Sequence, residues 1–327
     1  MTGEPGPGAA AARPARAVFF GSGPFGLAVL EAVRGHPGLS LVAVVSTPDR
    51  PSGRRAEPTP TPVSRRALEL GLPLLRPERL RSPEATGAIA ALAADLGVLA
   101  DYGRIVPPAI LDLPQHGILN VHPSILPRHR GASPIAAAVL AADREAGVTV
   151  IRMDEGVDSG PILAAATIAL TGTETAPELE ACLADVGATL FSRIVGRWLT
   201  GELTAEPQDE RAATMTRPFR RADGALDPTR PAAELERRVR ALAPWPGTFV
   251  ETSQGRLLVD RATVRPAMAG DVAGTIVAED AGLALATVDG RLRLDEVRLS
   301  GARRMTGAEL RRGRRALVGA RALREGV

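Results

Sequence analysis

The most distinctive absence in this chain of 327 residues is lysine, because all 40 basic residues are arginine. The absence excludes Schiff-base and lysine-nucleophile chemistry, and it excludes a phosphate-binding loop of the GK[ST] type. Arginine binds phosphate bidentately and keeps its charge, so contacts with nucleic acid stay open. A strong coding bias explains the missing lysine more simply than any functional cause.

Cysteine and aromatic residues are also scarce. The single cysteine, Cys182, excludes an internal disulfide and a cysteine-based metal cage. It falls in a helical apolar pattern with Leu179, Leu183 and Leu190, which predicts a small core residue. With one Tyr and two Trp in the chain, base stacking is expected to contribute little to any nucleic-acid binding.

Long apolar runs are missing as well. No stretch approaches the ~18 residues typical of a membrane span, and residues 1–16 lack the apolar centre of a secretory signal. The hydrophobic fraction of 45% is ordinary for a soluble globular protein. We therefore expect a flexible tail over 1–16 and a cytoplasmic protein without membrane contact.

Charge is divided unevenly along the chain. Residues 214–327 carry 21 of the 40 arginines against 14 of the 37 acidic residues, whereas the rest of the chain is acidic overall. An acidic N-terminal part and a basic C-terminal part suggest a catalytic domain joined to a domain that binds a polyanion. An arginine-rich solvated face without a partner is the alternative.

Strand and helix patterns alternate through the first two thirds of the chain. Apolar strands are expected at 17–20, 41–45, 72–75, 96–100, 117–122 and 148–153, and helices after residue 26 and at 62–70, 84–94 and 176–199. This alternation predicts an α/β fold, with a mostly parallel Rossmann-like sheet covered by helices on both faces.

The last third of the chain has a different pattern of predicted elements. One helix is expected at 232–242, and five short strands follow between 248 and 299, which predicts a small OB-like β-barrel. The expected division is a tail over 1–16, a catalytic domain over 17–200, a linker over 201–216 and the barrel domain over 217–322.

The run Gly21-Ser22-Gly23-Pro24-Phe25-Gly26 has the G-x-G-x-x-G pattern of a dinucleotide site, after a strand and before a helix. The second strand, however, ends at Val45-Ser46-Thr47-Pro48 without the acidic residue that would bind a ribose. Pro24 also has no N–H to give a phosphate. A tight turn without nucleotide is the better interpretation, and a non-catalytic nucleotide-binding protein is a rival one.

Asn120 and His122 carry the clearest chemical signal. They lie two residues apart at the end of an apolar run, and such residues of a strand point to the same face. Pro123 favours an extended His122 and ends the strand. An amide donor beside an imidazole suits a reaction in which a carbonyl oxygen gains negative charge while a proton moves nearby. A turn-capping Asn120 and a packing His122 are the structural alternative.

A second chemical element is the loop 153–161, which holds two glycines and the acids Asp154, Glu155 and Asp158. Glycines let a loop turn sharply and bring a carboxylate against other backbone. In α/β sheets such strand-end loops are where sites lie. Spacing alone does not say which acid matters, and a solvated turn is the alternative.

Beyond these patterns, the chain resembles the methionyl-tRNA formyltransferases, a family of enzymes that use 10-formyltetrahydrofolate. The central match also occurs in other folate-dependent formyltransferases, whereas the PDRPSGR and PWPG segments narrow the match to the tRNA enzymes. The matching segments are VFFGSGPFG (18–26), VVSTPDRPSGR (44–54), PTPV (60–63), DYGRIVP (101–107), ILNVHPSILPRHRGASPI (118–135), GVTVIRMDEGVDSGPIL (147–163), RALAPWPGTF (240–249) and SGARRMTGAELRRGRR (300–315).

The resemblance implies transfer of the formyl group of 10-formyltetrahydrofolate to the amino group of initiator methionyl-tRNA, for translation initiation. It implies that Asn120, His122 and Asp158 are catalytic, and that a monomer acts without a metal ion. The implied folate site comprises Ser124, Ile125, Leu126, Pro127, Tyr102, Gly103 and Arg104, and the implied tRNA contacts include Arg54 and Arg55.

The chain departs from the family at a few positions. His129 and Ser133 stand where the family usually has an aromatic residue and alanine, and arginines replace the lysines expected near 217–221. These departures bear on tRNA binding more than on the chemistry. A folate-dependent formyltransferase acting on an amino-sugar is the alternative, and the basic C-terminal part argues against it.

Overall fold

A computed structural model describes residues 13–52 and 57–323 of the chain. Residues 1–12 of the predicted tail 1–16 lie outside the described residues, as do the predicted tRNA-binding residues Arg54 and Arg55. Residues 15 and 16 of that predicted tail instead belong to the first strand. The contacts between residues group the chain into two compact units. The first unit holds the residues up to Pro127 together with 147–166 and 183–213. The second unit holds 128–146, 167–182 and the residues from 214 onward. Among the helices of the described residues, none has the length and apolar composition of a membrane span.

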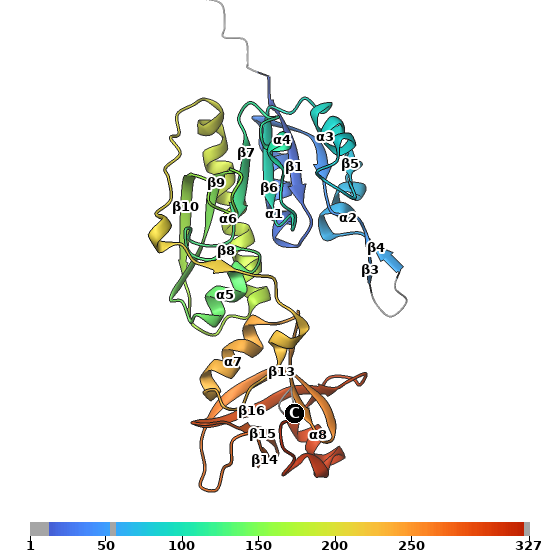
Figure 1. The fold of residues 1–327 in the computed structure, drawn as a ribbon, viewed down its shortest axis with the longest axis vertical. Coiled ribbons are helices and arrows are strands. Elements are labelled where there is room, and N and C mark those ends of the chain that lie inside the picture. Colours follow the sequence, from blue (N-terminus) through green and yellow to red (C-terminus); the bar gives the residue numbers. More distant parts are fainter. Residues whose placement is uncertain (1–12, 53–56, 324–327) are drawn as a thin grey trace, which may run out of the picture. The chain divides into compact units, whose positions relative to one another are not determined.

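The α/β part of the chain is built on a seven-stranded sheet in the order β10-β9-β7-β6-β1-β2-β5 (Figure 1). The pairs β5–β2, β2–β1, β1–β6 and β6–β7 are parallel, and β9 is antiparallel to β7. The predicted mostly parallel sheet is therefore confirmed. Its strands are β1 (Ala15–Gly21), β2 (Leu39–Val45), β5 (Leu74–Leu75), β6 (Leu96–Ala100), β7 (Ile118–His122), β9 (Glu145–Arg152) and β10 (Ile162–Ala169).

Helices cover both faces of this sheet, as predicted. Phe20 of β1 packs in one core cluster with Ile89 of α3 (Pro83–Ala90) and with residues of α4 (Pro108–Leu111). The preceding Phe19 is fully buried and points to the opposite face, because successive strand residues alternate. On that face, Gly187 of α6 (Ala176–Leu199) lies against Val121 of β7 and against Phe25 at the start of α1 (Phe25–Gly35).

Shorter elements belong to each unit. The first unit also holds α2 (Pro62–Glu69) and the hairpin of β3 (Arg50–Ser52) with β4 (Glu57–Thr59). The second unit also holds α5 (Pro134–Leu140) and the pair of β8 (Arg130–Gly131) with β11 (Met215–Thr216).

The glycine-rich turn between β1 and α1 uses its N–H groups internally. The backbone N–H groups of Ser22 and Gly23 both donate to the carbonyl oxygen of Asp101, at 2.9 and 3.1 Å. Asp101 directly follows β6, the neighbour of β1, so these bonds fasten the turn to the sheet. A dinucleotide site would need such N–H groups for the pyrophosphate. The geometry therefore favours the predicted tight turn without nucleotide.

The second unit contains an antiparallel sheet in the order β12-β13-β16-β15-β14, with β17 added against β16. Thr252 of β12 pairs with Ala322, and Thr275, next to β14, pairs with Arg321. The segment around 321 and 322 thus joins the two edge strands, which closes the sheet into the predicted small barrel. Its strands are β12 (Thr248–Thr252), β13 (Gly255–Pro266), β14 (Ile276–Glu279), β15 (Gly282–Ala286), β16 (Gly290–Leu299) and β17 (Met305–Thr306).

The barrel has its own hydrophobic core. Leu235 and Val239 of α7 (Ala232–Ala241) and Leu310 of α8 (Gly307–Gly313) contribute to one cluster with apolar residues of the strands, among them Leu285 and Leu292. All five side chains are 4% exposed or less. The two helices are therefore integral to the barrel domain.

Cys182 is exposed, so its prediction as a core residue is wrong. The buried face of α6 runs through Leu183, Phe191, Ile194 and Val195, all 4% exposed or less. These residues rotate the buried stripe away from position 182, because side chains three and four positions apart share one helix face.

Candidate active site

Three side chains singled out by the sequence meet at the carboxyl end of β7. Asn120 and His122 are each 5% exposed. The Asp158 carboxylate accepts a hydrogen bond from Asn120 Nδ2 at 2.9 Å, and its other oxygen lies 3.6 Å from His122 Nδ1. An amide, an imidazole and a carboxylate therefore share one largely buried site.

Strand β7 fixes the positions of the amide and the imidazole. Ile118 of β7 belongs to the core cluster beneath α3 and α4, so Asn120 and His122, two and four residues later, point to that same side. Neighbouring strands hold the register, because Asn120 pairs with Leu99 of β6 and His122 with Thr149 of β9. Buried polar side chains need partners. Asp158 accepts the hydrogen bond of the Asn120 amide and lies within ion-pair distance of the His122 imidazole.

Asp158 reaches β7 from the loop that leaves β9. Its φ of 51° lies in the left-handed region that few non-glycine residues adopt, and such residues gather at functional sites. A Cβ on Gly160 would lie 1.9 Å from the carbonyl oxygen of Arg152, so only glycine lets the loop return this closely. Asp154 instead accepts hydrogen bonds from the backbone and a hydroxyl of the same loop. The geometry therefore selects Asp158 as the acid of the site.

Gln208 supports this loop, and no sequence pattern singled it out. Its side-chain amide donates to the carbonyl oxygens of Asp158 and Gly160, at 2.8 and 2.7 Å. The backbone of Glu206 pairs with Ile162, where the loop enters β10. Part of the segment predicted as a linker is thus built into the support of the site. One glutamine in a polar stretch carries no periodic signal, which is why the sequence did not reveal it.

Thr149 of β9 fixes the segment that follows β7, and it too escaped prediction. Its hydroxyl donates to the Ser124 carbonyl at 2.7 Å and accepts from the Leu126 N–H at 3.1 Å. Ser124 and Leu126 are buried, while Ile125 and Pro127 are partly exposed. The predicted folate segment is therefore an ordered extension of the strand that carries Asn120 and His122.

The predicted folate residues Tyr102, Gly103 and Arg104 follow β6, the parallel neighbour of β7. Their loop therefore leaves the same edge of the sheet as the segment after His122. The Tyr102 ring lies in the core, edge-on to Phe20 at 5.8 Å, and burial raises the pKa of Tyr102 to about 12. Arg104 donates to two backbone carbonyls after β5. Any folate contact of Tyr102 must then come from its backbone.

Two apolar side chains near these loops are open to solvent. Ile105 is 62% exposed in the loop after β6, and Val157 is 46% exposed beside Asp158. Large apolar side chains at the strand ends of an α/β sheet are suited to cover an aromatic ligand.

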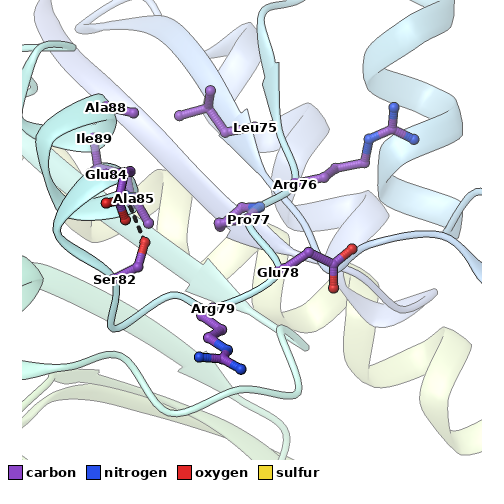
Figure 2. A pocket seen from close by; sticks show the side chains of 10 residues that line it. All are labelled: Leu75, Arg76, Pro77, Glu78, Arg79, Ser82, Glu84, Ala85, Ala88 and Ile89. Atoms are coloured by element: carbon purple, nitrogen blue, oxygen red, sulfur yellow. Dashed lines mark hydrogen bonds between the residues drawn. The ribbon is translucent and has the colours of Figure 1, made fainter.

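A cavity of about 510 Å³ lies between α3 and the segment after β5, and Figure 2 shows its lining side chains, from Leu75 to Ile89. Asn120, His122 and Asp158 are not among them. One lining residue, Arg76, is paired with Asp49 at 2.6 Å. The volume of a cavity does not by itself identify an active site, because the chemistry depends on polar groups that converge on one point.

His129, one of the departures from the family pattern, pairs with an acid. Its Nε2 lies 2.8 Å from Asp143, whose other carboxylate oxygen lies 2.6 Å from Arg128. Among residues 13–52 and 57–323, no three His, Cys, Asp or Glu side chains gather closely enough to hold a metal ion.

The three-residue site can perform two operations. The Asn120 amide and a protonated His122 can donate hydrogen bonds to an oxygen that becomes negative, and the Asp158 carboxylate can stabilise the imidazolium and accept a proton. Such an arrangement suits transfer of a carbonyl-containing group to an amine.

Comparisons with known proteins agree with this chemistry. Residues 15–195 match the model of the formyl transferase family, and residues 219–315 match the formyl transferase C-terminal domain. The methionyl-tRNA formyltransferase of Roseiflexus sp. (strain RS-1) is 41% identical over 309 residues, which cover 94% of this chain and 95% of the relative. That of Halorhodospira halophila is 42% identical over 306 residues, or 93% and 98% of the two chains.

Solved structures share the fold at lower identity. An N-formyltransferase from Helicobacter canadensis, crystallised with folinic acid and dTDP-3-aminofucose, has a TM-score of 0.61 at 14% identity and covers 89% of this chain and 100% of its own. HypX from Aquifex aeolicus in complex with tetrahydrofolic acid has a TM-score of 0.59 at 16% identity, covering 91% and 47%. With relatives about 40% identical over nearly its whole length, the chain belongs to the methionyl-tRNA formyltransferase family.

Proposed function

We propose that this protein transfers the formyl group of 10-formyltetrahydrofolate to the free amino group of initiator methionyl-tRNA. The products are N-formylmethionyl-tRNA, used for translation initiation, and tetrahydrofolate. The observation that carries the proposal is the convergence of Asn120 and His122 on Asp158, at 2.9 and 3.6 Å, in a chain with this family membership.

In the proposed mechanism, Asn120 and protonated His122 donate hydrogen bonds to the formyl oxygen as negative charge develops on it. A bond forms between the α-amine nitrogen and the formyl carbon, and the bond from that carbon to the folate nitrogen breaks. Asp158 accepts the proton that the amine loses, His122 gives a proton to the departing nitrogen, and transfer of a proton from Asp158 to the neighbouring His122 restores both groups. Loss of one oxyanion donor costs about 10²–10³ in rate.

The residues present fit a folate co-substrate. The segment Ser124–Pro127 continues directly from His122, and the loop Tyr102–Arg104 leaves the same sheet edge. We assign Ser124, Ile125, Leu126 and Pro127 to the folate site, together with the backbone of Tyr102, Gly103 and Arg104. The exposed Ile105 and Val157 would cover apolar parts of the co-substrate. The folate supplies an activated formyl group, so the proposed reaction uses no metal ion.

We assign the two activities to two domains. Residues 17–200 would carry the transfer reaction, 217–322 would bind tRNA, and 201–216 would connect them. Arg54 and Arg55 would hold the acceptor arm, and phosphate contacts by arginine would dominate binding. The proposed enzyme acts as a monomer in the cytoplasm, where initiator tRNA is charged.

A formylation assay with matched acceptors tests the function. The purified protein, 10-formyltetrahydrofolate and methionyl-tRNA should give N-formylmethionyl-tRNA, whereas an amino-sugar nucleotide should remain unmodified. Formylation of the amino-sugar alone would support the alternative function instead. No transfer to either acceptor would contradict a formyltransferase.

A further inference from the structure

Trp245 and Arg221 form an exposed cation–aromatic pair beside the barrel. Trp245 is 57% exposed, unusual for so large an aromatic side chain, and the guanidinium carbon of Arg221 lies 5.8 Å from its ring centroid. Within the described residues, Arg221 has no carboxylate partner, so its charge is not neutralised there. An indole face and a guanidinium plane are both surfaces on which a nucleobase stacks.

The backbone holds this pair in place. A Cβ on Gly224 would lie 2.1 Å from the carbonyl oxygen of Gly247, so the turn after Arg221 rests directly on the loop that carries Trp245. Leu226 donates its N–H to the Phe249 carbonyl at 2.9 Å, which fastens the same two segments further along. A pair fixed by main-chain contacts loses little conformational entropy when a ligand binds.

The neighbouring charges fit a polyanion. Arg217 and Arg220 are exposed close to Arg221 in sequence. Arg217 is paired with Asp223 at 2.6 Å, which offsets part of this charge, whereas Arg221 lies over the indole. Exposed arginines beside an exposed aromatic ring are the combination that binds single-stranded nucleic acid.

We propose that the Trp245–Arg221 pair stacks on an unpaired nucleobase of the RNA substrate. The inference rests on the proposed tRNA-dependent function. It adds a base contact to binding in which phosphate contacts were expected to dominate because aromatic residues are scarce. The recognised group is a nucleobase with free π-faces, so base-paired RNA would not engage the pair.

Tryptophan fluorescence tests the contact directly. The chain has two Trp, and Trp198→Phe leaves Trp245 as the only reporter. Titration with uncharged initiator tRNA should quench this emission, whereas blunt duplex RNA of similar length should bind without quenching. Quenching by neither RNA, or by both equally, would overturn the proposal.

Variants separate stacking from charge and from a structural role. Trp245→Ala should weaken tRNA binding about tenfold with an unchanged slope of log Kd against log salt, and Trp245→Phe should recover most of the affinity. Arg221→Gln should weaken binding and also reduce that slope, while Arg230→Gln, an exposed arginine paired with Glu234, should change little. Equal weakening of duplex RNA by Trp245→Ala, or no effect of Trp245→Ala, would contradict stacking.

The formylation assay run in parallel distinguishes the two proposals. If the parent protein formylates methionyl-tRNA and Trp245→Ala leaves its KM unchanged, the stacking inference fails and the proposed function stands. If tRNA binding depends on Trp245 while no formyl transfer occurs, the proposed function fails and the stacking inference stands.

Discussion

At the scale of single residues, the site depends on one carboxylate that serves two donors. Asp158 accepts from Asn120 through one oxygen and lies beside His122 with the other. The left-handed backbone of Asp158 persists only because its surroundings hold it, and Gln208 provides two of the holding contacts.

Gln208→Ala tests that support. We expect kcat to fall by about tenfold or more, because a small displacement of a catalytic group is costly, while KM for tRNA and the melting temperature change little. The exposed Gln115→Ala is the matched control. A parental kcat for Gln208→Ala, measured by steady-state formylation, would show that the glutamine does not position Asp158.

The sequence predicted the strand residues of the site but did not by itself identify the acid of the loop. The two-residue spacing of Asn120 and His122 predicted their shared face, because strand geometry is local. The choice of Asp158 over Asp154 rested on family resemblance, since the loop path depends on the close return at Gly160 and on Gln208, about 50 positions away. Contacts across such separations leave no periodic pattern in the chain.

At the scale of elements, one threonine couples β9 to the segment after β7. Thr149→Val removes the hydroxyl that serves the Ser124 carbonyl and the Leu126 N–H, so two buried backbone groups lose their partner. We expect a loss of about 1–3 kcal/mol in unfolding free energy and a raised KM for the folate. Thr149→Ser keeps the hydroxyl and should stay close to the parent. Equal stability of the Val and Ser variants in urea titrations would refute the coupling.

The barrel holds a buried ion cluster with a pH-dependent contribution. Arg291 binds Asp271 through Nε and Nη2 and binds Glu279 through Nη1, and all three side chains are at most 13% exposed. Hydrogen bonds from Arg291 lower the pKa of Asp271. A carboxyl whose folded pKa is depressed stabilises the fold above its unfolded pKa of about 3.9, and this contribution is lost as pH falls through the folded pKa.

Asp271→Asn should therefore destabilise the protein at pH 7, by less than the ~3 kcal/mol expected for a fully unpaired buried charge, because Arg291 keeps its partner Glu279. The difference from the parent should begin to shrink as pH falls below about 3.9, where the carboxyl of the unfolded chain takes up a proton, and it should disappear once pH falls below the lowered pKa of the folded carboxyl. Asp112→Asn, at an exposed position, serves as the control. A parent–variant difference in urea unfolding that is the same at pH 7 and pH 3 would disprove this linkage.

Helices and strands were predicted correctly where a hydrophobic period extends over many residues. The prediction failed where contacts between distant residues determine the length of an element. Helix α6 has the predicted bounds because its apolar pattern persists over 24 residues. Strand β13 extends over 12 residues to Pro266, longer than the short strands predicted for this region, because pairing with β16 continues it through alternating exposed residues. Helix α8 was not predicted, although Thr306 and Glu309 form a capping box at its start. Its seven residues are too short for a clear apolar stripe.

At the scale of the whole molecule, arginine is the basic residue available for the proposed contacts with tRNA, because the sequence has no lysine. We expect the Kd for methionyl-tRNA to rise at least about tenfold between 50 and 200 mM salt, because bound phosphates release counterions. The KM for the folate should change far less. Equal salt dependence of both substrates would argue against a phosphate-dominated tRNA contact.

The most direct test of the mechanism is a double-mutant cycle on kcat for formyl transfer. His122→Ala should lower kcat about 10²–10³-fold, and Asp158→Asn, which tolerates the left-handed backbone, should lower it substantially. If the two groups act as a unit, the double variant should be no worse than His122→Ala by more than a few-fold, while His116→Ala stays at the parental rate. Losses that multiply in the double variant, or a parental kcat in either single variant, would contradict a shared catalytic centre.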